Sequence, residues 1–398
     1  MKKFIPLIVL AVALTISLWY VFNTNFLTVY DASRALALYN HYRADVLLWH
    51  PMTNEMQLQN TGLLDTYLPA MLQRVLRIEP VLFYKLYLAL VVAFVPLVTY
   101  FIGRKLIGMH VGIVSAVVVM GWVAFYQGGS FGRLNVAVII FGLLVLTMLG
   151  DSKYKIVKLV SLSALLPLAH YGTAFIAVPI LAGTLAWTLL RDRRRATYVS
   201  VILVTLLLVI SIWHGVVNNG VALYPIKYMV SGRVAPVAAE NVPGDVNTPS
   251  QITDNPSWLT KTDKISQALV GVADPDGDGT WTLNYLLLLF AWVMIMTLLI
   301  GVLRAILSRE IPALYKVVCL LSLTGVAVVF LLPQLSRGYG VEKVYYQAIV
   351  VAAPCFYLGA GKLSGWLRLK STIWVEAVIL LPYTALMYKF GVIPSVLG

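Results

Sequence analysis

Charged residues are scarce in this chain. Only 12% of its 398 residues are Asp, Glu, Lys or Arg, whereas 60% are hydrophobic. Soluble domains carry roughly 25% charged residues, so the composition excludes a soluble globular protein. Acidic residues are fewer than basic residues, 17 against 30. The sequence therefore predicts an integral protein of the cell membrane.

Cysteine is nearly absent as well. The two thiols, Cys319 and Cys355, fall inside apolar stretches and form no CxxC pattern. This excludes an external disulfide framework and a cysteine-based metal site. The basic excess forms no stripe away from the apolar stretches, which excludes a nucleic-acid partner.

Long apolar stretches dominate what is present. A helix needs about 20 apolar residues to cross the hydrocarbon core, and we count about eleven such stretches. We predict an all-α, polytopic transmembrane helix bundle in one integral membrane domain, residues 1–398. The spans are expected at 4–22, 82–102, 109–126, 134–150, 156–170, 173–190, 196–214, 282–303, 314–333, 344–361 and 371–389.

Two of these spans depend on choices between alternatives. No A-x-A cleavage site follows residue 22, so the first span is interpreted as a retained anchor and not as a signal peptide. Pro167 and the His170-Tyr171-Gly172 segment interrupt 156–190. A single crossing there would also translocate the basic cluster at 191–195, so we predict two short helices joined by an outward-facing turn.

Basic residues mark alternate ends of the spans, and the positive-inside rule makes that side cytoplasmic, together with the N-terminus. They are Lys2, Lys3, Arg104, Lys105, Lys153, Lys155, Lys158, Arg191, Arg193, Arg194, Arg195, Arg304, Arg309, Lys316, Lys362, Arg368 and Lys370. The long outer loops are then 23–81 and 215–281. The first is expected to hold a helix over 32–45 and an amphipathic surface helix after Asp65. The second, rich in Pro, Gly, Asn and Asp, is expected to be irregular.

An anchor that leads into a large outer loop with an acidic residue and a surface helix resembles the layout of GT-C glycosyltransferases. Leu64–Gly103, the turn at His170–Thr173 and Gly338–Pro354 resemble an uncharacterised family of archaeal polytopic membrane proteins. The GT-C resemblance implies transfer of a sugar from a polyprenyl-phosphate carrier at the extracytoplasmic face.

The same resemblance places the first-loop carboxylate at Asp31, as the base that deprotonates the acceptor hydroxyl. Asp31 also stands where it would cap the helix that follows it, and both roles remain open. The neighbouring Ala32 departs from a pattern of two adjacent acidic residues. The 127–133 loop has no carboxylate, which argues against a metal site like that of oligosaccharyltransferases.

Three cations stand in the short outer loops against the positive-inside rule. Arg133, Arg337 and Lys343 are candidates to bind the phosphate of the lipid carrier. Tyr339 belongs to a tight Arg337-Gly-Tyr-Gly turn that could bring backbone N–H groups to the same head group. The alternative for Arg337 is a salt bridge with Glu342.

His170 is a candidate catalytic residue because an ionisable group at a break between membrane helices is functional by default. A neutral histidine that binds a freed backbone carbonyl is the alternative. His214 ends a span and is expected at the interface.

Two motifs could hold a divalent cation. His41 and Asp45 lie four residues apart on the predicted first-loop helix, where a surface hydrogen bond is the alternative. Asp274, Asp276 and Asp278 match the first half of a calcium loop, although Tyr285 replaces its last ligand, and an acidic turn is the alternative.

These features predict a GT-C-like glycosyltransferase, with a non-catalytic membrane subunit or a lipid or solute transporter as alternatives. The spans carry almost no charge apart from Glu376 and Lys389, which disfavours a transporter. The expected partners are the bilayer, a polyprenyl-phosphate-linked sugar and other membrane or extracytoplasmic subunits.

Overall fold

The computed structural model describes residues 2–23, 36–42, 62–121, 132–218, 220, 281–331 and 341–392, and only the backbone of 23, 281–288, 341–342 and 385–392. Every regular element in these ranges is a helix, which confirms the predicted all-α class there. The helices are α1 (Ile5–Asn23), α4 (Tyr67–Leu76), α5 (Pro80–Leu106), α6 (Met109–Met120), α8 (Gly132–Leu149), α9 (Lys155–Ala169), α10 (Tyr171–Arg191), α11 (Arg193–Val209), η3 (Ile210–Val217), α14 (Trp281–Leu307), α15 (Ala313–Leu331), α17 (Val341–Trp366) and α18 (Ile373–Val392).

A helix stands at every predicted span. Among the described residues, 8 helices are long and apolar enough to cross a membrane. Three predicted spans fall on shorter elements: α6, with 12 residues, α9, with 15 residues, and the apolar part of α18, Ile373–Thr384. The prediction of about eleven crossings is thus supported for eight helices. The short ones need shielding by neighbours or a thinner bilayer to cross.

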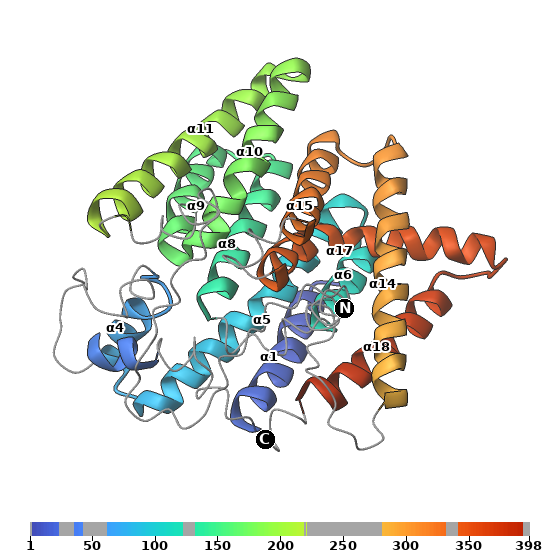
Figure 1. Ribbon diagram of the computed structural model, residues 1–398, viewed down its shortest axis with the longest axis horizontal. Coiled ribbons are helices and arrows are strands. Elements are labelled where there is room, and N and C mark those ends of the chain that lie inside the picture. The colour runs from blue at the N-terminus through green and yellow to red at the C-terminus, as the bar shows by residue number, and fades with distance from the viewer. Residues whose placement is uncertain are drawn as a thin grey trace.

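The centre of the bundle is formed by α8 and α17, whose spans bury 67% of their residues, the largest share of any candidate span in the described part. In Figure 1, α17 crosses the molecule and extends past α14, while α11 and α4 lie on the other side. α17 packs against α14, α15, α6, α5 and α8. Its apolar core includes Tyr346, Val350 and Phe356, all fully buried.

Two glycines allow α14 and α17 to approach closely. A Cβ on Gly301 would collide with the carbonyl oxygen of Cys355, and one on Gly359 would collide with the carbonyl oxygen of Thr297. Small residues let membrane helices touch along their backbones, where packing replaces the hydrophobic drive that lipid removes. The α14–α17 crossing therefore depends on these two positions.

The predicted break within 156–190 is confirmed, although only α9 is short, since α10 has 21 residues. Pro167 removes one helical N–H near the end of α9, and His170 alone separates α9 from α10 with extended backbone angles, φ −159 and ψ 117. His214 near the end of η3 contacts Pro167, and Tyr198 near the start of α11 contacts Lys155 near the start of α9. α9 and α11 therefore run in the same direction and pack against each other, and α10 connects them in the opposite direction.

This geometry defines two ends of the bundle. The His170 end carries the first residues of α5, α8 and α10 and the last residues of α9 and η3. The Lys155 end carries the α8–α9 and α10–α11 turns. The 18 residues of α8 connect the two ends and span about 27 Å, close to the hydrocarbon thickness of a bilayer of about 30 Å.

The described parts of the first long loop contain two helical stretches. Residues 36–42 are helical within the predicted 32–45 helix. α4 is amphipathic: Leu68, Leu72, Val75 and Leu76 are exposed, whereas Gln73 is buried and donates to the carbonyl of Ile78. The apolar face of α4 therefore points away from the protein, and its position on the bilayer surface stays a prediction. The second loop, 215–281, lies almost wholly outside the described residues.

Candidate functional site

A polar cluster occupies the His170 end. It consists of Asp65, Arg133, His170 and Lys343, which come from the first loop, the start of α8, the α9–α10 turn and the start of α17. The positive charges of Arg133 and Lys343 act on His170, whereas the negative charge of Asp65 and the positive charge of Arg133 act on Tyr84. Four segments far apart in the sequence thus place their ionisable groups together.

The segment 62–66 anchors the cluster to the membrane helices. The N–H of Leu63 donates to the carbonyl of Leu168 at 2.9 Å, and the hydroxyl of Tyr87 on α5 donates to the carbonyl of Leu64. Thr66 Oγ1 donates to the carbonyl of Gly62 at 3.0 Å and closes the turn. Asp65 is buried as a result, with 1% of its surface exposed.

Two glycines permit the close approach of this segment to α8. A Cβ on Gly132 would collide with Oδ1 of Asp65, and one on Gly62 would lie 2.7 Å from Cδ of Arg133. The Asp65 carboxylate thus lies against the first residue of α8. A carboxylate is favoured there because the first N–H groups of a helix carry partial positive charge.

His170 caps the helix that it precedes. Its Nδ1 accepts from the backbone N–H of Thr173 at 3.2 Å and lies 2.9 Å from Thr173 Oγ1. With Nδ1 as the acceptor, the neutral ring carries its proton on Nε2, a tautomer assigned from the hydrogen bonds. His170 is buried, with 6% of its surface exposed. Burial, Arg133 and Lys343, in that order, hold the pKa of this imidazole well below its usual value.

The carbonyls freed at the end of α9 are accounted for by other residues. The Nε2–H of His214 donates to the carbonyl of Pro167 at 3.1 Å, and the backbone N–H of Leu63 donates to the carbonyl of Leu168. His214, and not His170, therefore makes the hydrogen bond to a freed backbone carbonyl that was the alternative role for His170. His214 is fully buried among the helices at this end, with its ring 6.3 Å from that of Tyr171, and its predicted position at the membrane interface stays a prediction. It lies in a π-helical turn, a feature often found near functional sites.

The structure brings together three of the predicted site residues, Arg133, His170 and Lys343. Asp31, Arg337, Tyr339, Asp45, Asp274, Asp276 and Asp278 lie outside the described residues, so their roles stay predictions. His41 is exposed, with its ring 5.4 Å from that of Tyr42. Within the described part of the chain, no group of three or more His, Cys, Asp or Glu side chains could hold a metal ion.

Sequence reasoning missed Asp65, Gly62 and Gly132 as parts of the site. Asp65 was interpreted only as the start of a surface helix, although α4 begins two residues later, at Tyr67. The sequence did offer one indication, a carboxylate flanked by two leucines and a threonine in a loop beside the membrane. If such a carboxylate is buried, it needs a hydrogen-bond donor or a positive charge nearby. Nothing in the sequence indicated that Gly132 would receive it.

No protein-family model matches the chain, and no curated protein matches its sequence. Solved structures do match its fold. The apo oligosaccharyltransferase of Archaeoglobus fulgidus aligns with 98% of this chain and 56% of its own, with a TM-score of 0.56 and 13% identity. AglB from the same organism, in complex with an inhibitory peptide and a dolichol-phosphate, aligns with 99% of this chain, with a TM-score of 0.53 and 14% identity.

The chain therefore spans little more than half the length of the oligosaccharyltransferases that it resembles. At this identity the likeness concerns the fold alone. The fold resembles that of the membrane part of an archaeal oligosaccharyltransferase, a GT-C glycosyltransferase, over nearly the whole of this chain.

Proposed function

We propose that this chain is a GT-C-like glycosyltransferase that takes a sugar from a polyprenyl-phosphate carrier at the extracytoplasmic face. The observation that supports the proposal is that Arg133, Lys343 and His170 lie at one end of the bundle. The Arg133 side chain and the carbonyl of Ala169 both lie against Gly62, and Tyr346 near the start of α17 donates to Asn135 near the start of α8 at 2.7 Å. Two cations beside a histidine that stays neutral form an environment for an anion. A lipid-linked phosphate is an anion that reaches such a site from the bilayer.

Each residue of the cluster has a role in this proposal. Arg133 and Lys343 bind phosphate oxygens through charge-assisted hydrogen bonds. The Nε2–H of His170 donates a further hydrogen bond without adding charge. When the bond between the sugar and the phosphate breaks, negative charge develops on the departing phosphate, and the two cations stabilise it. Asp65 lies against the start of α8 and fixes the position from which Arg133 extends.

The proposed role of Asp31 towards the acceptor is supported by the resemblance to GT-C glycosyltransferases and not by the polar cluster. The acceptor hydroxyl attacks the anomeric carbon, its proton passes to a base, and the carrier phosphate leaves. Asp31 is the proposed base. A non-catalytic membrane subunit that binds the same lipid phosphate is the second candidate, because the described cluster contains phosphate-binding groups without an exposed carboxylate.

A binding measurement tests the phosphate site. Arg133→Gln and Lys343→Gln should each weaken binding of a polyprenyl phosphate to the purified chain by about tenfold or more, the value of one charge-assisted hydrogen bond. Arg77→Gln is the matched control, since Arg77 is an exposed cation beyond the end of α4. Unchanged affinity in both cluster variants would overturn the assignment.

A transfer assay on the same preparations separates the two candidate functions. Asp31→Asn should leave polyprenyl-phosphate affinity unchanged and abolish sugar transfer from a polyprenyl-phosphate donor. Binding without transfer in the unsubstituted chain would support the non-catalytic subunit. Normal transfer by Asp31→Asn would remove Asp31 from the mechanism.

A further inference from the structure

The Lys155 end carries a second concentration of charge, remote from the polar cluster. The α8–α9 turn and the α10–α11 turn meet there: the ammonium of Lys155 lies 4.9 Å from the ring centre of Tyr198, and Arg194 shares a hydrogen bond with the same tyrosine. Together the two turns contain seven cations and only two carboxylates, Asp151 and Asp192.

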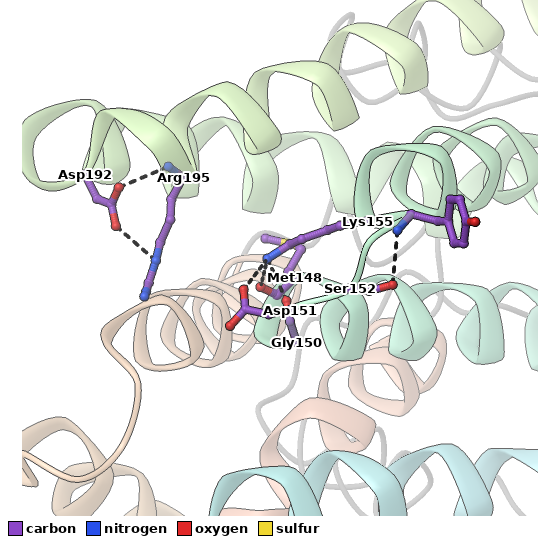
Figure 2. Close-up of polar contacts among 8 residues, drawn as sticks. Met148, Gly150, Asp151, Ser152, Lys155, Asp192 and Arg195 are labelled. Atoms are coloured by element: carbon purple, nitrogen blue, oxygen red, sulfur yellow. Dashed lines mark hydrogen bonds and ion pairs between the residues drawn. The ribbon is translucent and has the colours of Figure 1, made fainter.

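Both carboxylates are engaged within the turns. Asp192 accepts from the backbone N–H of Arg195 at 3.1 Å and pairs with the Nε of Arg195 at 3.0 Å (Figure 2). Asp151 lies 4.0 Å from the ammonium of Lys155. Lys155 also donates to the carbonyls of Met148 and Gly150 at 3.1 and 2.8 Å, where it caps the end of α8. Lys155 and Arg195 are therefore structural cations.

The remaining five cations form an exposed basic patch: Lys153, Lys158, Arg191, Arg193 and Arg194. Within the described part of the chain, none of the five takes part in an ion pair. Mutual repulsion of five like charges is unfavourable unless a counter-charge compensates it. We therefore expect the basic patch to bind an anionic partner that can offset several positive charges.

Apolar side chains surround the patch at the same level of the bundle. Tyr154, Val157, Leu189 and Leu190 are 57% to 84% exposed. Such side chains are stable in contact with acyl chains, which places the basic patch beside the head groups of one leaflet. Because these side chains lie among acyl chains, the anions nearest to the basic patch are the head groups of the lipids around them.

We propose that the basic patch binds anionic lipids of the leaflet at the Lys155 end, opposite to the polar cluster. Clusters of four to eight basic residues beside membrane helices bind acidic head groups, at about 1 kcal/mol per residue. Lysines and arginines at two adjacent turns would hold one or two head groups between α9 and α11. This proposal does not depend on the proposed transferase activity.

The experiment compares lipid binding by two charge-matched variants of the full chain in detergent. One variant carries Lys153→Gln, Lys158→Gln, Arg193→Gln and Arg194→Gln. The control carries Lys105→Gln, Arg309→Gln, Lys362→Gln and Lys370→Gln, which removes the same charge from other turns of the predicted cytoplasmic side. Binding of phosphatidylglycerol and of phosphatidylcholine is measured by native mass spectrometry.

The unsubstituted chain should prefer phosphatidylglycerol, and the patch variant should lose at least about tenfold in affinity for it, while the control changes by about twofold or less. Added salt should weaken the same preference. Equal loss in both variants, or none in either, would overturn the proposal, as would stronger binding of an oligonucleotide of similar charge. The smaller variant Lys158→Gln/Arg193→Gln tests the same prediction if the fourfold one does not fold.

Discussion

His170 combines three constraints in one side chain. It caps α10 through Nδ1, it is buried, and it stands beside two cations. The first constraint requires an acceptor, and the other two disfavour the charged ring. A residue with these constraints is suited to donate a hydrogen bond from Nε2 and is a weak proton acceptor near neutral pH. The structure therefore favours a binding role for His170 over the general-base role that catalysis would ask of it.

The lowered pKa of His170 makes the stability of the chain depend on pH. Because its pKa in the fold lies below the unfolded value of about 6.5, the unfolded state binds the proton more readily. The stabilising contribution is complete above about pH 6.5 and is lost as the pH falls towards the pKa in the fold. His170→Asn keeps a side-chain acceptor for the N–H of Thr173 and removes the titration.

We expect the stability of the His170→Asn variant to fall less between pH 7 and pH 5 than that of the unsubstituted chain, by up to about 1.4 kcal/mol per pH unit. Thermal unfolding in detergent at several pH values measures the difference. The contribution of the other histidines cancels in the comparison. Parallel pH profiles would contradict a depressed pKa at His170.

Helix ends and helix crossings are held by different means in this bundle. At the ends, side chains satisfy the exposed carbonyls: Lys155 caps α8, and Lys316 donates to the carbonyls of Ile306 and Ser308 after α14. In both cases the lysine lies near the start of the next helix, so its hydrogen bonds link the two helices of the hairpin. At the crossing of α14 and α17, Gly301 and Gly359 let the two backbones come into contact because glycine has no side chain.

Substitution of Gly359 tests the crossing. Gly359→Ala would force its Cβ into the carbonyl oxygen of Thr297 and should lower stability by about 1–3 kcal/mol or more, the usual effect of overpacking. Gly365→Ala, in the same helix, is the control because a Cβ there would meet no atom within 4 Å. Thermal unfolding of both variants provides the measurement. Equal stability of the two variants would mean that the helices can separate without loss.

At the scale of the whole molecule, polar chemistry is divided between two ends. The His170 end gathers ionisable groups from four segments into a cluster of buried and half-buried side chains, whereas the Lys155 end presents cations on exposed turns. Between them, spans such as α8 have no ionisable group beyond their first or last turn. The positive-inside rule predicts that the Lys155 end is cytoplasmic and the polar cluster extracytoplasmic.

Cysteine labelling in intact cells tests this orientation. Arg77→Cys stands on the predicted outer side and Lys153→Cys on the predicted inner side, and both positions are exposed. A membrane-impermeant maleimide should label Arg77→Cys in intact cells and Lys153→Cys only after permeabilisation. Cys319 and Cys355 are buried and should stay silent as internal controls. The reverse pattern would place the polar cluster in the cytoplasm and contradict the proposed donor side.

Much of the architecture could be predicted because the bilayer imposes a local code. Span length, apolar composition and the placement of Lys and Arg are properties of contiguous residues, so each predicted span corresponds to a helix. The break at His170 was predictable for the same reason, since Pro167 and the basic cluster at 191–195 both lie in the sequence. Two residues of the polar cluster, Arg133 and Lys343, were predicted as exceptions to the charge rule.

The sequence by itself determined that the chain is a helical membrane protein, where its helices begin and end within a few residues, and which of its charges are unusual. Only the tertiary structure decided which charges meet. The 127–133 loop has no carboxylate of its own, yet Asp65, from a loop nearly seventy residues earlier, lies against Gly132. Periodicity and charge rules report on neighbours along the chain, whereas such contacts depend on how helices pack, and packing follows from shape that no local pattern records.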